Sequence, residues 1–132
     1  MALTYVCSPL SAPSRAEIMV NAQRARTYMA MSEREFGCRA VAPHAYLPYL
    51  LDDSNPEERA LALSFGASLL ALCDRLVIYG DRISSGMKAE IRRAQELGIP
   101  IFDRQMELAD DPSDPVIVGR YINGISLNGL EY

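Results

Sequence analysis

The sequence predicts an α/β sandwich in which helices cover both faces of a four-stranded parallel sheet. Short apolar runs rich in strand formers alternate with longer segments of helical periodicity. Each periodic segment begins at a capping residue, and two of them end at glycine. The length of 132 residues suits one domain with a single core. Because this alternation produces parallel strands through right-handed crossovers, we expect a flavodoxin-like or Rossmann-like three-layer fold with strand order 2-1-3-4.

The first strand and helix are expected within residues 3–36. The apolar run 3–7 is followed by a proline-containing turn, which is typical of a buried strand that ends in a loop. Ser14 and Glu17 have capping-box spacing, and apolar residues then recur at helical spacing. Gly37 ends this helix and a second strand follows at 39–42.

The second helix is expected after a loop at 43–53 that has room for one helical turn. Asn55 and Glu58 occupy the N-cap and third positions of this helix, with proline between them at its start. The helix continues through residue 73, and its apolar stripe consists of Leu61, Phe65, Leu69 and Leu72.

A third strand and helix complete the repeated pattern. Residues 75–79 form the strongest strand signal of the chain, which stops at Gly80-Asp81. A helix opens near Ser84 or Ser85, carries apolar residues on one face, and ends at Gly98. A fourth strand is expected at 101–102.

Residues 1–103 are therefore expected to form the sheet domain, and residues 104–132 a linker and β-hairpin appendage. Residues 110–115 are acidic and rich in proline, and Asn123-Gly124 between two apolar runs is a strong hairpin signal. So short a hairpin has no core of its own, so we expect it to pack on the domain or on a second subunit.

Composition excludes several classes of function. With 13 Lys and Arg against 17 Asp and Glu, the chain carries a net charge of −4, which predicts neither a nucleic-acid partner nor an anionic membrane. It begins without a signal-peptide pattern and has no apolar run of about 18 residues, so a cytoplasmic location is expected. Three widely spaced cysteines and one histidine favour core thiols and predict no metal site and no cofactor.

Candidate binding residues cluster where ligands bind in open α/β sheets, beyond the carboxyl ends of the strands. The helix that opens at Ser84 presents N–H groups that favour an anion, although Ser-Ser-Gly is equally a plain capping turn. The candidate ligand-binding residues are Cys7, Ser8, Pro9, His44, Tyr46, Gly80, Ser84, Ser85, Gly86 and Met87.

Glu90 is the first candidate for catalysis. It lies one turn into the third helix, three residues after Met87, and therefore borders the buried face. Helical side chains lean toward the N-terminus, which would aim this carboxylate at the crevice. The alternative is an exposed glutamate that pairs with Lys88 or Arg93.

The segment Ser84-Ser85-Gly86-Met87-Lys88-Ala89-Glu90-Ile91-Arg92-Arg93-Ala94, preceded by an Asp-led apolar strand at 74–79, resembles the core motif of the nucleoside 2-deoxyribosyltransferase superfamily. Tyr5-Val6-Cys7-Ser8-Pro9 likewise resembles its first strand and ligand loop. The superfamily includes 2'-deoxynucleoside 5'-phosphate N-hydrolases and small, often phage-associated DUF4406-type proteins. The resemblance covers about residues 3–102.

This resemblance implies that Glu90 attacks the anomeric carbon of an N-glycoside while the base leaves, as in retaining glycosidases. Ser84 and Gly86 would hold the ribose or a 5'-phosphate, with Ser8 on the opposite wall, and no cofactor takes part. The implied partners are a small-molecule nucleoside or nucleotide and further copies of the chain, since members are generally homo-oligomers.

The chain departs from the family at the proton donor. Members commonly carry an aspartate eight residues before the Asp that opens the third strand, and here that position is Gly66. The acid role would then fall to Asp81, or to one of Asp52, Asp53, Glu57 and Glu58. Asp74 is expected to be structural, and the residues His44, Tyr46 and Tyr49 either contact a base or pack beneath their loop.

Two functions from different classes follow. The first is an enzyme that cleaves nucleoside or nucleotide N-glycosidic bonds or transfers deoxyribose, with Glu90 as nucleophile and Asp81 as candidate acid. The alternative is a non-catalytic nucleotide-binding protein of the same fold, which Gly66 favours. A third interpretation is an interaction module that uses the hairpin as its contact surface.

Overall fold

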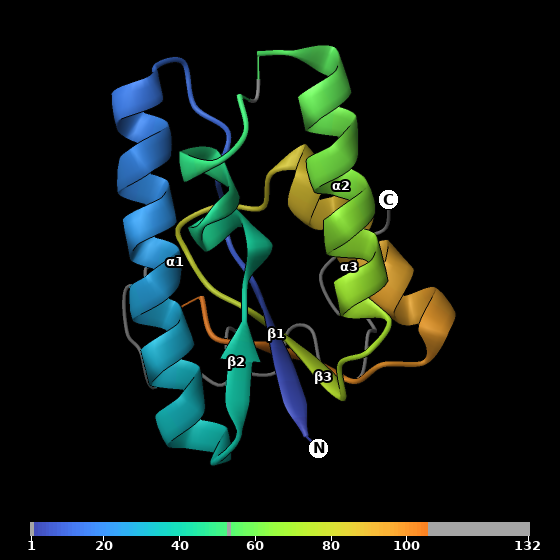
Figure 1. Cartoon of the computed structure of the whole chain (residues 1–132). Helices are drawn as coiled ribbons and strands as arrows, with labels where there is room; N and C mark the ends of the chain where they lie inside the picture. The colour runs from blue at the N-terminus through green and yellow to red at the C-terminus, as the bar shows by residue number, and fades with distance from the viewer. Residues whose placement is uncertain (1, 53, 106–132) are drawn as a thin grey trace.

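The four strands form one parallel sheet in the order β2-β1-β3-β4, which confirms the predicted fold (Figure 1). The computed structural model describes residues 2–52 and 54–105. Its elements are β1 (Leu3–Cys7), α1 (Arg15–Phe36), β2 (Arg39–Val41), the 3-10 turns η1 (Pro43–Ala45) and η2 (Leu47–Tyr49), α2 (Pro56–Leu70), β3 (Arg75–Ile78), α3 (Ser85–Leu97) and β4 (Ile101–Asp103).

The sheet is the middle of three layers. Helix α1 covers one face, and α2 and α3 cover the other (Figure 1). Because strand side chains alternate between faces, Tyr5 and Cys7 of β1 pack in the core beneath α2 and α3, whereas Val6 packs on the α1 side. Tyr5 and Cys7 therefore lie on the face of β1 that α2 and α3 cover.

The predicted caps form in all three helices. The side chains of Ser14, Asn55 and Ser84 each accept a hydrogen bond from a backbone N–H in the first turn. Gly37 and Gly98 end α1 and α3 in the left-handed conformation, with φ of 67° and 71°. The helix starts are thus determined by local sequence.

The predicted apolar stripe of α2 is wrong. Leu61, Phe65 and Leu72 are 59%, 53% and 69% exposed, whereas Gly66 and Leu70 face the core. Apolar residues lie on every side of this helix, so their spacing does not select a face. The small Gly66 allows the helix to pack closely over Tyr5, because an added Cβ would already lie 3.4 Å from the Tyr5 hydroxyl. The loop before α2 contains two 3-10 turns instead of one helical turn.

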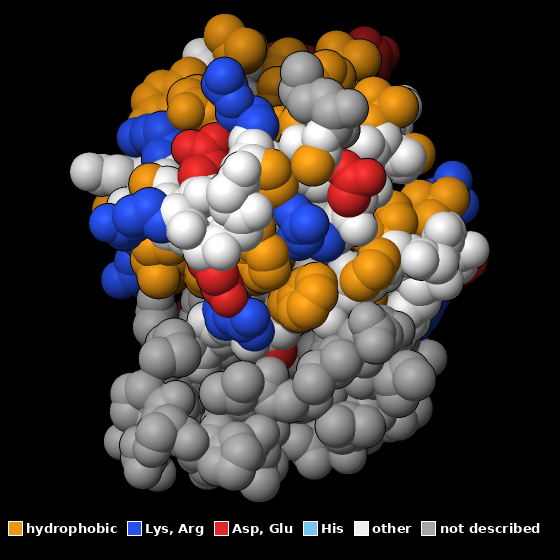
Figure 2. Space-filling view, turned by 90° about the horizontal axis from the view of Figure 1, so that it is seen from below, with side chains coloured by type: hydrophobic (Ala, Val, Ile, Leu, Met, Phe, Trp, Pro, Cys, Tyr) orange, Lys and Arg blue, Asp and Glu red, His pale blue; other side chains and the backbone are white. Residues whose placement is uncertain are grey.

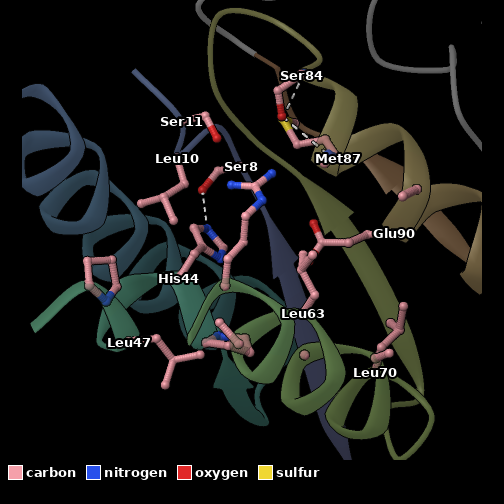
Figure 3. A pocket seen from close by; sticks show the side chains of 18 of the residues that line it. Ser8, Leu10, Ser11, His44, Leu47, Leu63, Leu70, Ser84, Met87 and Glu90 are labelled. Carbon is pink, nitrogen blue, oxygen red and sulfur yellow. Dashed lines mark hydrogen bonds between the residues drawn. The ribbon is translucent and has the colours of Figure 1, made fainter. Parts of the chain in front are cut away.

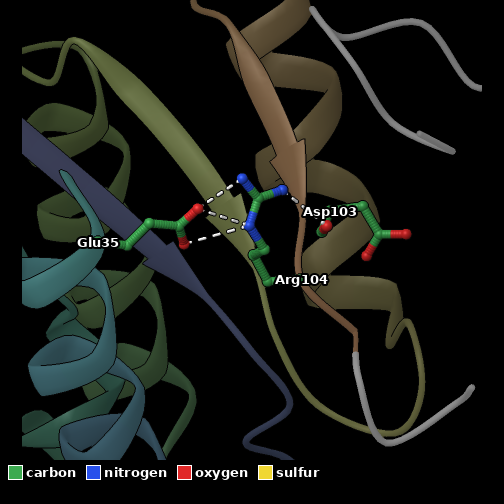
Figure 4. Close-up of polar contacts among 3 residues, drawn as sticks. All are labelled: Glu35, Asp103 and Arg104. Atoms are coloured by element: carbon green, nitrogen blue, oxygen red, sulfur yellow. Dashed lines mark hydrogen bonds and ion pairs between the residues drawn. The ribbon is translucent and has the colours of Figure 1, made fainter. Parts of the chain in front are cut away.

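Arg104 joins the end of β4 to α1. Its Nη2 and Nε atoms lie 2.6 and 2.9 Å from one carboxylate oxygen of Glu35 (Figure 4). The guanidinium also lies over the rings of Phe36 and Phe102, 5.9 and 5.8 Å from their centroids. The Arg104–Glu35 ion pair thus lies over Phe36 and Phe102 beside β4; we call this ion pair the clasp.

The described surface carries both signs of charge. Figure 2 shows basic and acidic side chains interspersed with apolar ones on the end of the molecule that is lowest in Figure 1. Cys7 and Cys73 are buried as expected of core thiols, whereas Cys38 is partly exposed beside Arg75. No helix among the described residues is long and apolar enough to cross a membrane. The predicted linker at 110–115 and the Asn123-Gly124 hairpin lie outside the described residues.

Candidate active site

A cavity of about 370 Å³ opens between β1, the η1–η2 segment, α2 and the start of α3 (Figure 3). It lies at the carboxyl end of β1, where the order of strands reverses, as expected for an α/β sheet. Most of its wall is apolar. Its lining residues with polar or charged side chains are Tyr5, Ser8, Ser11, His44, Glu58, Arg59, Ser84, Glu90 and Arg93.

Glu90 enters the cavity from α3 and is held by two side chains of β1. The Tyr5 hydroxyl donates a short hydrogen bond to Glu90 Oε2, and the Cys7 thiol lies 3.4 Å from Oε1 as a second donor. Both donors come from the same face of β1 because they are two residues apart. In Figure 3 the carboxyl group of Glu90 points into the cavity, toward α2. The arrangement fixes the orientation of one carboxylate at the edge of the core.

Burial determines the protonation of this group. It raises the pKa of Glu90 to about 7, against the opposing effect of the hydrogen bonds from Tyr5 and Cys7. Burial and the nearby Glu90 carboxylate raise the pKa of the Tyr5 hydroxyl and of the Cys7 thiol well above their usual values. Tyr5 and Cys7 therefore remain protonated donors at neutral pH, while Glu90 titrates in the physiological range.

Ser8 and His44 form a second polar pair in the cavity. Ser8 Oγ and His44 Nε2 lie 2.7 Å apart (Figure 3). Burial lowers the pKa of His44 to about 4, so the imidazole is neutral at pH 7. The pair offers hydrogen bonds without a positive charge.

The N-terminus of α3 forms the edge of the cavity beside Glu90. Ser84, Gly86 and Met87 line this edge, and Ser84 Oγ accepts a hydrogen bond from the Met87 N–H at 3.2 Å. Ser85 is exposed and does not line the cavity. Six of the predicted site residues therefore lie on one cavity: Ser8, His44, Ser84, Gly86, Met87 and Glu90.

Asp81 does not lie in this cavity. It is exposed and lines a separate hollow with Arg82 and the first turns of α1. Gly80 turns the chain with φ of 108°, which carries the next residue away from Glu90. Asp81 is therefore not placed to protonate a leaving group beside Glu90.

Three predicted binding residues do not line this cavity and pack against other side chains: Pro9, Gly80 and Tyr46. A Cβ at Gly80 would lie 2.6 Å from Pro9 Cδ, so the two loops touch directly. Tyr46 is 51% exposed, and the Arg26 guanidinium lies 5.8 Å from its ring centroid. Cys7 is buried behind Glu90 and reaches the site only through that carboxylate.

The other candidate acids are also mostly remote. Asp52 accepts hydrogen bonds from Ser54, and neither it nor Glu57 lines the cavity, while Asp53 lies outside the described residues. Glu58 does line it, and its Oε1 accepts a hydrogen bond from the Asp52 N–H at 3.0 Å. Asp74 lies at the opposite end of the sheet, where it accepts from the Leu3 N–H, which supports the expected structural role.

Sequence reasoning missed Tyr5, Arg59 and Arg93, all of which line the cavity. Tyr5 could have been found from the alternation of β1, because it shares a face with Cys7. The two arginines lie on helices, and their placement depends on how α2 and α3 are rotated about their axes. No three His, Cys, Asp or Glu side chains gather in a metal-binding group within residues 2–52 and 54–105.

Comparison with known proteins identifies a fold and a family. The structure is similar to that of a 2-deoxyribosyltransferase from the psychrotolerant bacterium Bacillus psychrosaccharolyticus, with a TM-score of 0.57 and 18% identity over 83% of this chain and 77% of that one. At this identity the likeness shows the fold alone. No curated protein matches the sequence. Residues 2–104 match the family described as a domain of unknown function, DUF7768, and the chain therefore belongs to that family.

Proposed function

We propose that the protein cleaves the N-glycosidic bond of a nucleoside or nucleotide, or transfers its deoxyribosyl group, with Glu90 as the nucleophile. The observation that carries this proposal is a partly buried carboxylate held by Tyr5 and Cys7 at the edge of an apolar cavity. Perturbed carboxyl groups in such cavities are candidates for catalysis. The 2-deoxyribosyltransferase fold of the similar structure supports the same class of reaction.

In the proposed reaction one oxygen of ionised Glu90 attacks the anomeric carbon of the sugar. The bond from that carbon to the base breaks, and its electron pair leaves with the base nitrogen. Water or a second base then displaces the glycosyl ester and restores the carboxylate. Hydrolysis and transfer differ only in this second acceptor.

The neighbouring groups have separate roles in this proposal. Tyr5 and Cys7 are positioning residues, because their hydrogen bonds hold the Glu90 carboxylate in one orientation. In this proposal Ser84 and the first N–H groups of α3 bind hydroxyl or phosphate oxygens of the sugar, as helix N-termini favour. The Ser8–His44 pair and the apolar wall would contact the base.

The test is Glu90→Gln, assayed by chromatography for free base from a panel of nucleosides and nucleotides, with and without a second free base. We expect the variant to lose at least about 10³-fold in rate, since the glycosyl ester cannot form. Glu57→Gln is the matched control, because it removes the same charge from an exposed glutamate that does not line the cavity.

Normal turnover by a folded Glu90→Gln variant would refute the role of Glu90. No base release from any substrate, together with a rise in melting temperature when a nucleotide is added, would instead identify a non-catalytic nucleotide-binding protein.

A further inference from the structure

Tyr5, His44 and Glu58 are the lining side chains considered as acids for a leaving base, and each has another partner among the described residues. A neutral purine or pyrimidine leaves slowly unless an acid protonates it. Among the described lining residues, the Tyr5 hydroxyl already donates to Glu90, and its pKa is raised. His44 is neutral at pH 7 because burial lowers its pKa to about 4. Glu58 Oε1 accepts the Asp52 N–H in the loop before α2.

The wall that α2 forms is mostly apolar. Helix α2 contributes Ala62, Leu63, Gly66, Ala67 and Leu70 to the lining, and its first turn adds the charged Glu58 and Arg59. Figure 3 shows Leu63 and Leu70 on α2 and the Glu90 carboxyl group on the opposite side. A Cβ at Gly66 would lie 3.4 Å from the Tyr5 hydroxyl, so this position of α2 adjoins the partner of Glu90. One carboxylate thus faces an apolar surface with room for an aromatic ring.

Resting on the proposed function, we infer that the preferred substrates are N-glycosides whose leaving group already carries a positive charge, such as pyridinium nucleosides. Attack by Glu90 forms the C1'–O ester bond while the C1'–N bond breaks, and the electron pair neutralises the ring nitrogen. Water then cleaves the ester and gives the free sugar, the carboxylate and one proton. The leaving group departs as a neutral amine and requires no proton.

Electrostatics favour this reaction in an apolar cavity. The ground state contains a carboxylate and a cationic ring, and the first step converts both into neutral groups. Isolated charges are costly in an apolar environment, so their mutual neutralisation is favoured there more than in water. Arg59 and Arg93 also line the cavity, with exposed side chains that could pair with phosphate groups. A test of the leaving group must therefore use substrates without phosphate.

The test compares 7-methylinosine with inosine, a pair that differs by one methyl group and one positive charge, each as riboside and 2-deoxyriboside. Nicotinamide riboside serves as the pyridinium probe. We expect kcat/KM for the cationic member to exceed that of the neutral one by about 10²-fold or more at pH 6, where N1 of 7-methylinosine still holds its proton and the ring is cationic, the usual effect of a general acid. Glu90→Gln should abolish both activities.

A second variant tests whether a missing proton donor causes this preference. Gly66→Asp should raise the rate on neutral inosine by at least about tenfold without a matching gain on 7-methylinosine, because Gly66 lines the cavity and a Cβ there would be in ordinary contact with the Tyr5 hydroxyl, at 3.4 Å. Gly66→Ala, which adds the Cβ without an acid, should give no gain. Circular dichroism and melting temperature establish that each variant is folded.

The outcomes separate this inference from the function on which it rests. Equal cleavage of inosine and 7-methylinosine by the wild-type protein would overturn the inference while N-glycoside cleavage stands. A folded Gly66→Asp variant that remains as slow on inosine as the wild type would also overturn it, since a missing proton would not be the cause. No release from any substrate would remove the proposed function and the inference with it.

Discussion

Glu90 lies on the boundary between the core and the cavity, and its titration links activity to stability. Burial raises its pKa to about 7, while the Tyr5 hydrogen bond lowers it. The ionisable residues that share its surroundings are Tyr5, Cys7, His44, Glu58, Arg59 and Arg93. The proposed nucleophile is therefore only partly ionised at neutral pH.

The rate of base release should rise with pH and level off above an inflection near pH 7, because in the proposed reaction only ionised Glu90 attacks. In Tyr5→Phe the inflection should move to higher pH, since a hydrogen bond that favours the charged form is removed. Rate measurements on both proteins between pH 5 and 9 test this. An unchanged inflection in Tyr5→Phe would contradict the assigned contact.

Whereas the rate should rise with pH, the contribution of Glu90 to the free energy of unfolding should fall with pH. The folded-state pKa of about 7 exceeds the ordinary value of 4.5, so the folded state holds a proton that the unfolded state releases within this window. The free energy of unfolding of the wild type should therefore fall as pH rises from about 4.5 through 7. Glu90→Gln removes this dependence, so its advantage in melting temperature should be larger at pH 8 than at pH 5. Thermal unfolding at both values measures it, and Glu57→Gln serves as the control.

Much of the candidate site was predictable at the level of single residues. Strand ends and helix starts are locally encoded, and they placed Ser8, Ser84 and Glu90 on one crevice. The prediction for Asp81 failed because the chain turns at Gly80, with a φ of 108°, and Asp81 then lies in the hollow beside α1; local sequence does not specify the direction of this turn. Tyr5 was overlooked because a buried strand position was interpreted as core alone.

At the level of elements, helix α2 shows that residue spacing does not predict how a helix is rotated about its own axis. Its cap and its first turn follow from Asn55 and Pro56, but its rotation about its own axis does not follow from spacing. The apolar residues surround the axis, and contact with Tyr5 selects the side that carries Gly66. Tertiary packing thus decided which side chains form the cavity wall.

The cap of α2 should contribute to both stability and the cavity wall. Asn55 Oδ1 accepts from the N–H groups of Glu57 and Glu58 at 3.0 and 3.2 Å. Asn55→Ala should lower the free energy of unfolding by about 1 kcal/mol, the usual cost of losing an N-cap. Ser68→Ala, at an exposed position of the same helix, should change it by less than about 0.5 kcal/mol. Equal effects in urea unfolding would contradict the capping role.

At the scale of the whole molecule, the Arg104–Glu35 clasp ties the last described strand to the first helix. Two guanidinium nitrogens bind Glu35, and the group also covers two aromatic rings. A double-mutant cycle with Arg104→Gln and Glu35→Gln should give a coupling energy of about 0.5–1 kcal/mol. The exposed Arg93–Glu96 pair, at 3.6 Å, should give a coupling near zero. A coupling no larger than that of the control pair would show that the Arg104–Glu35 clasp does not contribute to the free energy of unfolding.

The whole fold was the most predictable level, because alternation of strands and helices leaves few topologies open. The sheet order and layers agree with the prediction, and within the described residues the differences lie at element ends, in the loop before α2 and on one helix face. The fold fixes where a site can lie, and the side chains decide what it can do.

The contact between Pro9 and Gly80 has an evolutionary consequence. The loops after β1 and β3 meet there with no space for a Cβ. Within the DUF7768 family, positions 9 and 80 should therefore change together: a larger residue at 80 requires a smaller or displaced one at 9. Invariance of these two positions would indicate that the contact between the two loops is needed to form the crevice, independently of which ligand each homologue binds.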